Sequence, residues 1–261
     1  MDLGIAGRTA LVLGGGGGIG GAIAQMLAEE GAKVAVADIN AEAAKLRAES
    51  IISAGGQALA LGWDIGELGA IEGNTRAIEE FLGPVDILVN NTGGPPPSPV
   101  LGQDPTVWIS YFQSMVLSVI AITDRVVPGM RSRGWGRVIT SASSGVIAPI
   151  PNLGLSNALR AGLLGWSKTL AREVAADGVT CNVVVPGRIG TQRTEFLDRA
   201  KAEREGKTVE QVSAASRATI PAGRYGNPRE YASMVTFLAS APASYVTGSL
   251  VRVDGGLIAS L

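Results

Sequence analysis

The 261-residue sequence contains no histidine, one cysteine and few aromatic residues (5%). Without histidine the chain cannot form a Ser-His-Asp triad or a histidine-ligated metal site, and we expect no metal centre. The lone Cys181 excludes an internal disulfide framework, and its apolar surroundings predict a place in the core. No signal peptide and no apolar run of membrane-spanning length are visible, which favours a cytoplasmic protein without a membrane partner.

Neither sign of charge dominates the chain. The 22 Lys and Arg residues balance 23 Asp and Glu residues, and the basic residues do not cluster, which argues against a nucleic-acid partner. Hydrophobic residues make up 46% of the chain, enough for a substantial core, and the 36 glycines are scattered among apolar segments, where they indicate turns. No linker or repeat interrupts residues 1–261, so we predict a single domain.

Short apolar runs alternate with helical patterns along the whole chain. Strands are predicted at Ala10–Leu13, Lys33–Ala37, Gln57–Gly62, Ile87–Asn90, Arg137–Ser141, Thr180–Val185 and Leu250–Val253. Helices are predicted at Gly20–Glu30, Ala41–Ala54, Leu68–Phe81, Thr106–Arg133, Leu155–Ala176 and Pro228–Leu238. This alternation predicts an α/β fold, a doubly wound (Rossmann) domain in which helices cover both faces of a parallel seven-stranded sheet.

The stretch Ala10–Gln25, ALVLGGGGGIGGAIAQ, passes from a strand through a glycine cluster into a helix. Gly14, Gly18 and Gly20 form a G-x-x-x-G-x-G pattern, with Ile19 between the last two. Such a turn lets main-chain N–H groups approach a phosphate, and the helix start adds unpaired donors. A tight turn that binds nothing is the alternative interpretation of these glycines taken alone.

An acidic residue follows the second strand at the spacing that a dinucleotide site needs. Asp38 lies 18 residues beyond Gly20, where a carboxylate accepts hydrogen bonds from the ribose hydroxyls of a dinucleotide. No Arg or Lys directly follows Asp38 to bind a 2′-phosphate. The sequence therefore predicts NAD as the cofactor in preference to NADP.

Two further segments suggest contacts beyond the core. The middle of Trp108–Val127 is apolar on nearly every side, which predicts that part of it faces another subunit. Thr191–Thr219 is charged and irregular and follows the sixth strand, so it predicts a mobile lid over the carboxyl end of the sheet. A solvated surface helix is the alternative for that segment.

Several motifs, in the right order, make the chain resemble the short-chain dehydrogenase/reductase family, and within it the 3-oxoacyl-acyl-carrier-protein reductases. Asn90-Asn91-Thr92-Gly93 is similar to the NNAG stretch of that family, and Pro186–Thr191 to its PGxIxT segment, whose threonine reaches the nicotinamide amide. Asp64, followed by Ile65, matches an acid that contacts adenine. The resemblance implies a small carbonyl or alcohol substrate and a homo-oligomer, usually a tetramer. The expected cofactor-binding residues are Gly14, Gly18, Ile19, Gly20, Asp38, Asp64, Ile65, Asn90, Gly93, Arg160, Pro186, Gly187, Ile189 and Thr191.

The catalytic positions depart from the family. The family serine is present as Ser143, but Ser156 stands at the tyrosine position, Arg160 at the lysine position and Met115 at the asparagine position. An aliphatic hydroxyl is a far weaker acid than tyrosine, whose pKa is about 10 in water. Arg160 supplies positive charge but cannot relay protons. We expect Ser143, Ser156 and Arg160 to polarise a carbonyl with the help of an ordered water, and Tyr111 to pack at a subunit contact.

Three functions remain open from the sequence. Because every cofactor motif persists, the first is an NAD(P)(H)-dependent oxidoreductase of 3-oxoacyl reductase type with an atypical proton path. The loss of three catalytic positions suggests the second, a non-catalytic NAD(H)-binding sensor or partner subunit. The third is non-redox chemistry on the same fold.

Overall fold

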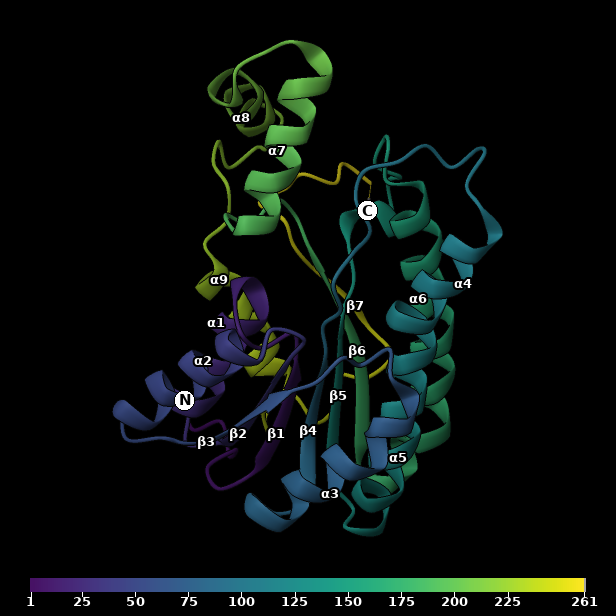
Figure 1. Ribbon diagram of the computed structural model, residues 1–261. Helices are drawn as coiled ribbons and strands as arrows, with labels where there is room; N and C mark the ends of the chain where they lie inside the picture. Colours follow the sequence, from purple (N-terminus) through teal and green to yellow (C-terminus); the bar gives the residue numbers. More distant parts are fainter. Residues whose placement is uncertain (261) are drawn as a thin grey trace.

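In the computed structural model, which describes residues 1–260, seven parallel strands form one sheet in the order β3-β2-β1-β4-β5-β6-β7 (Figure 1). The strands are β1 (Thr9–Leu13), β2 (Lys33–Asp38), β3 (Gln57–Gly62), β4 (Val85–Asn90), β5 (Gly136–Ser141), β6 (Val179–Pro186) and β7 (Leu250–Val253). The order reverses beside β1, between β1 and β4, and this switch point places a ligand crevice at the carboxyl ends of the strands. The predicted doubly wound fold is confirmed.

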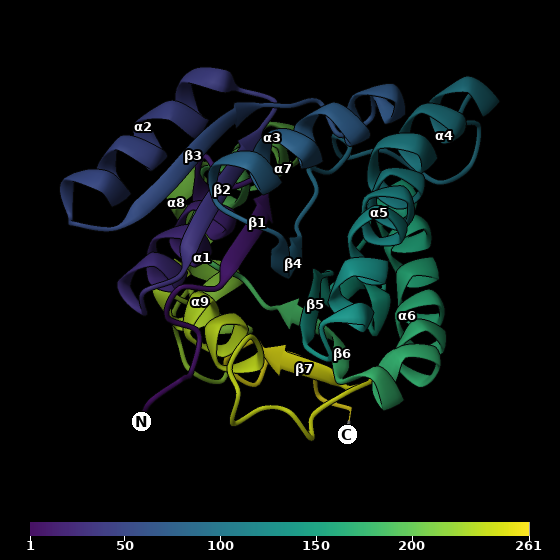
Figure 2. The same cartoon turned by 90° about the horizontal axis from the view of Figure 1, so that it is seen from below.

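Helices cover both faces of this sheet (Figure 2). They are α1 (Gly18–Glu29), α2 (Ala41–Ser53), α3 (Ile71–Phe81), α4 (Pro105–Phe112), α5 (Ser118–Ser132), α6 (Gly154–Val174), α7 (Gln192–Glu205), α8 (Val209–Ala218) and α9 (Pro228–Leu238). One apolar core lies between the sheet and α1, α2 and α9, and the other between the sheet and α3, α5 and α6. Strand β1 serves both cores, because Ala10 and Val12 face one side and Leu11 and Leu13 the other.

The predicted helix Thr106–Arg133 is divided in the structure. Asp104 caps α4 by accepting a hydrogen bond from Thr106 N (2.7 Å), and a π-helical turn, Gln113–Leu117, separates α4 from α5. Within the continuous helical stretch 105–132, an 18-residue window has a mean hydropathy of 1.5, so by length and composition alone the stretch is apolar enough to cross a membrane. In this fold it covers the sheet, with Val119 and Ile122 fully buried.

The segment predicted to be an irregular lid is regular. Helices α7 and α8 occupy most of residues 191–219 and project above the carboxyl end of the sheet (Figure 1), so the segment is not irregular as predicted. Arg188 Nη1 donates to Asp198 Oδ1 (2.9 Å) and the Tyr225 hydroxyl donates to Asp198 Oδ2 (2.6 Å). These bonds anchor α7 to the chain on either side of it. A charged surface without an apolar pattern hides such a helix from sequence analysis.

Candidate active site

The glycine turn after β1 forms a cradle of main-chain groups. Gly14 and Gly18 have φ angles of 59° and 56°, which favour glycine, and a Cβ on Gly20 would overlap the carbonyl of Gly14. No side chain caps the start of α1, so the first N–H groups of that helix are open to an anion. The residues of this cradle therefore fit the diphosphate of a dinucleotide.

Asp38 lies against this turn. Its Oδ2 accepts from Gly16 N (3.0 Å) and its Oδ1 from Asn40 N (2.9 Å), which fixes the carboxylate at the end of β2. Asp64, beyond the end of β3, is exposed and accepts from Gly66 N (2.8 Å), next to Ile65. The carboxylates predicted for the ribose and adenine contacts thus follow adjacent strands of one sheet edge.

Asn90 does not have the cofactor-binding role that the sequence predicts for its side chain. Its side chain is 1% exposed and donates to the hydroxyls of Thr123 (3.3 Å) and Thr140 (3.4 Å), in the core beneath α5. It cannot offer its side chain to a cofactor, because the alternation of β4 turns it to the α5 face. The neighbouring Asn91, not among the expected residues, donates to the carbonyls of Leu13 (3.3 Å) and Gly14 (3.4 Å) and supports the glycine turn. The only signal for Asn91 in the sequence was its place directly after Asn90 in the Asn90–Gly93 motif.

The Pro186–Thr191 segment crosses from β6 to the glycine turn. Gly190 N donates to Gly226 O (2.9 Å), and a Cβ at Gly187 would meet Asp254 at 2.8 Å or less. Thr191 caps α7, and its side chain lies 3.8 Å from the position of a Cβ at Gly18. The structure thus brings Thr191 next to Gly18, although the two motifs are far apart in the chain.

The three candidate catalytic residues lie after β5 and at the start of α6. Ser143 follows the end of β5, and Ser156 and Arg160 lie in the first two turns of α6. Ser143 Oγ accepts from Gly145 N (3.1 Å), which leaves its hydroxyl proton free to donate to a ligand. Ser156 and Arg160 are buried, one turn apart on the same side of α6. The Arg160 guanidinium donates to three main-chain carbonyls, those of Ser141 (3.3 Å), Thr92 (3.0 Å) and Gly93 (2.8 Å).

The contacts of Arg160 therefore differ from those expected of a residue that binds the cofactor. Its Nη2 joins the end of β4 to α6 and has no N–H left for ribose hydroxyls, whereas Nε and one N–H of Nη1 are not used in these three bonds. Burial, with a smaller contribution from nearby Arg193 and a small opposing effect of Tyr231, lowers the pKa of Arg160 to about 10. The guanidinium stays positive at neutral pH.

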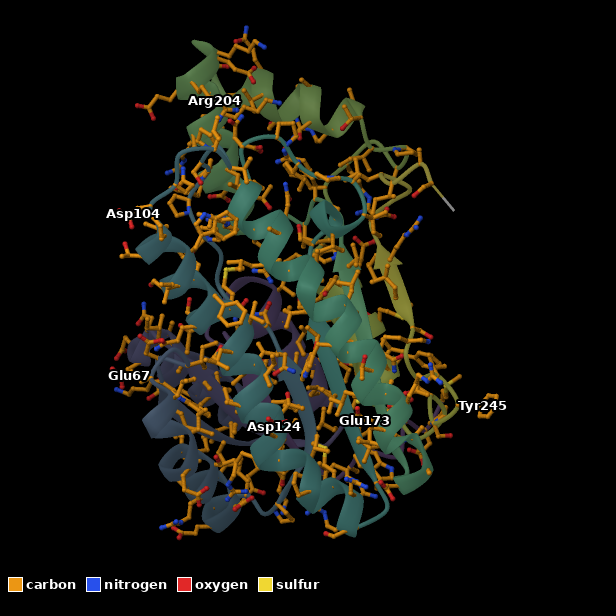
Figure 3. The ribbon with its side chains drawn as sticks, turned by 90° about the vertical axis from the view of Figure 1, so that its right-hand side faces the viewer. Glu67, Asp104, Asp124, Glu173, Arg204 and Tyr245 are labelled. Atoms are coloured by element: carbon orange, nitrogen blue, oxygen red, sulfur yellow. The ribbon has the colours of Figure 1, made fainter. Side chains whose placement is uncertain are left out.

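None of the four tyrosines stands at the site of the lost one. Tyr231 is fully buried on α9, where it donates to Val184 O (3.0 Å), and burial raises its pKa. Tyr225 is bound to Asp198, and Tyr245 points outward into solvent (Figure 3). Tyr111, on α4, packs on the apolar cluster that contains Met115.

Met115 places an apolar side chain at the position where the family has a catalytic asparagine. It is 2% exposed, lies within the π-helical turn, and packs with Leu159 and Leu163 of α6. The π-helical turn is therefore present although Met115 carries no polar side chain there. Cys181 is buried, and desolvation raises its pKa to about 12, so the predicted core role holds. Within residues 1–260 no group of three Cys, Asp or Glu side chains could hold a metal ion.

Comparison with known proteins agrees with this geometry. A family model described as enoyl-(acyl carrier protein) reductase matches residues 14–258. The 3-oxoacyl-[acyl-carrier-protein] reductase FabG of Vibrio cholerae is 37% identical over 96% of this chain and 97% of its own. Nodulation protein G of Azospirillum brasilense is 35% identical over 96% and 98%. L-Sorbose reductase of Gluconobacter frateurii, solved with NADPH and L-sorbose, is 30% identical over the whole of both chains, with a TM-score of 0.94.

Proposed function

Because the chain belongs to the short-chain dehydrogenase/reductase family, we propose that it transfers a hydride between NAD(H) and its substrate with no tyrosine in the proton path. Like its relatives it is an NAD(P)-dependent oxidoreductase that acts on carbonyl or CH–OH groups. The observation that carries the proposal is the main-chain cradle from the uncapped start of α1 to Asp38, beside Ser143, Ser156 and Arg160. When bound, the cofactor supplies or accepts the hydride.

The preference for NAD is supported by the position of Asp38. Its carboxylate is held 3.0 Å from Gly16 N, inside the turn that would bind the diphosphate. A carboxylate at this place accepts hydrogen bonds from ribose hydroxyls and repels a 2′-phosphate. The sorbose reductase was solved with NADPH, so this preference would separate the chain from that relative.

Proton transfer is assigned to hydroxyls and water. Ser143 and Ser156 donate hydrogen bonds to the substrate oxygen, and the charge of Arg160 stabilises the negative charge that develops there. A water molecule then delivers the proton. The loss of one general acid costs roughly 10²–10⁴-fold in rate, while positioning of the reactants contributes more, so a slow reductase remains catalytic.

A non-catalytic, NAD(H)-binding protein is the second candidate. It is favoured by one observation, that the Arg160 guanidinium is bonded to three main-chain carbonyls and so has a structural use without any reaction. Non-redox chemistry on this fold has no such observation in its favour.

Two measurements separate these candidates. NADH binding is followed by fluorescence titration, and NADH oxidation is measured with ketones and 3-oxoacyl thioesters, including those of the FabG relative. Turnover with any substrate supports the oxidoreductase. NADH binding without turnover supports the sensor, and Ser156→Tyr combined with Arg160→Lys then tests whether the missing acid is the only defect. Failure to bind either NADH or NADPH contradicts both candidates.

A homo-oligomer, a tetramer on family precedent, is also proposed. Ile109 and Phe112 of α4 are 65% and 45% exposed, an apolar surface on the helix predicted to face another subunit. The lid function of residues 191–219 and the cytoplasmic location stay predictions.

A further inference from the structure

Two arginines from different helices meet at one glycine of the active site. Arg160 Nη2, from α6, bonds the carbonyls of Thr92 and Gly93, and Arg193 Nη2, from α7, donates to Pro95 O (2.6 Å). A Cβ at Gly94 would lie 3.4 Å from Arg193 Nη2 and 3.5 Å from Arg160 Nη2. The two nitrogen atoms are thus at most about 7 Å apart, a range in which partly buried charges interact strongly.

Within residues 1–260, neither positive charge has a negative partner. None of the ion pairs in residues 1–260 involves Arg160 or Arg193, and the acceptors of both guanidinia are neutral carbonyls. Burial lowers the pKa of Arg193, an effect that nearby Tyr111 partly offsets. Arg160 is buried, whereas Arg193, at the start of α7, is exposed, so an anion that bridges them would offset the repulsion between the two charges.

The position of the pair identifies the source of that anion. A cofactor diphosphate would lie on the glycine turn at the start of α1, whereas Arg193 bonds the loop after β4 and lies near Tyr111 of α4. Arg160 is one turn from Ser156, on the catalytic side of the crevice. The pair therefore faces the substrate, and a planar carboxylate is the group that guanidinium N–H donors bind best.

We propose that Arg160 and Arg193 bind a carboxylate of the substrate, so that the natural substrate is an oxo acid and the product a hydroxy acid. This rests on the proposed oxidoreductase function and narrows its substrate class. The reaction balances: the hydride adds to the carbonyl carbon, a proton from water adds to the oxygen, and the carboxylate is unchanged.

The test compares oxo acids with their methyl esters. Pyruvate, acetoacetate and levulinate, each beside its ester, are titrated calorimetrically into the NADH-loaded protein without regard to turnover. We expect at least one acid to bind roughly tenfold or more tightly than its ester, the usual effect of a charged hydrogen bond. Arg193→Gln should abolish this difference and leave ester binding unchanged, while Arg193→Lys should restore part of it. Arg199→Gln changes an exposed residue of the same helix and serves as the matched control.

Three outcomes overturn the proposal. One is equal affinity for acids and esters, and another is the absence of binding by any of the acids at millimolar concentration. The third is an Arg193→Gln variant that binds NADH and ADP-ribose more weakly but keeps its acid-to-ester ratio, which would assign Arg193 to the cofactor diphosphate. A protein that binds the acids by way of Arg193 but never oxidises NADH would contradict the proposed function while leaving the carboxylate site intact.

Discussion

Removal of the Asp38 charge should change which cofactor the protein binds. Asp38 Oδ2 accepts from Gly16 N (3.0 Å) and Oδ1 from Asn40 N (2.9 Å), so the carboxylate cannot turn away from the ribose side. A unit charge 4 Å from another costs between about 1 kcal/mol in water and about 4 kcal/mol near a protein surface. Because Asp38 is half-buried, we expect the repulsion of a 2′-phosphate to lie between these limits.

The variant Asp38→Asn keeps the size of the side chain and removes the charge. NADPH affinity should rise about fivefold or more. NADH affinity should fall about tenfold, because a hydrogen bond from ribose to a charged acceptor contributes about 1.5–3 kcal/mol. The amide also has only one acceptor oxygen for the two main-chain N–H donors, Gly16 N and Asn40 N, which costs about 1 kcal/mol of stability.

Fluorescence titration with NADH and NADPH measures both affinities, and thermal unfolding measures the loss of stability. Glu42→Gln, in the first turn of α2, removes a nearby acid that does not contact the glycine turn and serves as the control. A wild-type protein that binds NADPH more tightly, or a ratio of affinities that Asp38→Asn leaves unchanged, would refute the assignment of Asp38 to cofactor selection.

Three further predictions follow from particular contacts. Burial lowers the pKa of Arg160 to about 10, below its unfolded value, so its charged form destabilises the fold below pH 10 and this penalty fades as pH rises above it. Affinity for an oxo acid, measured by calorimetry, should therefore be constant from pH 7 to about 9 and fall as pH passes through about 10, whereas ester affinity should not change. Asp198→Asn should cost about 1–3 kcal/mol, because the amide keeps only one acceptor oxygen for Arg188 and Tyr225 and removes the buried negative charge, and hydrogen exchange should accelerate in α7; exchange at the wild-type rate would contradict the anchoring role. Phe112→Asp should lower the mass measured by light scattering if α4 packs on a second subunit, and an unchanged oligomer would exclude this face.

The sequence by itself determined the sheet, the glycine turn and the place of Asp38. Each depends on patterns within about twenty residues: apolar runs, glycine where a positive φ is needed, and an acid after the next strand. The loss of the catalytic tyrosine was also visible, because Ser156 lies at a fixed spacing from Ser143. The sequence was sufficient for those features whose conformation depends on residues close to them in the chain.

Only the tertiary structure decided where the polar side chains point and what they meet. The side chain of Asn90 points into the core, where it donates hydrogen bonds to Thr123 of α5 and Thr140 of β5. No local sequence pattern predicts these partners. Arg160 meets three carbonyls from two strand ends, and Arg193 reaches the same loop from a helix whose charged sequence looks like ordinary surface. Side-chain direction and desolvation depend on distant segments that pack together, and these segments are neighbours only in the folded chain.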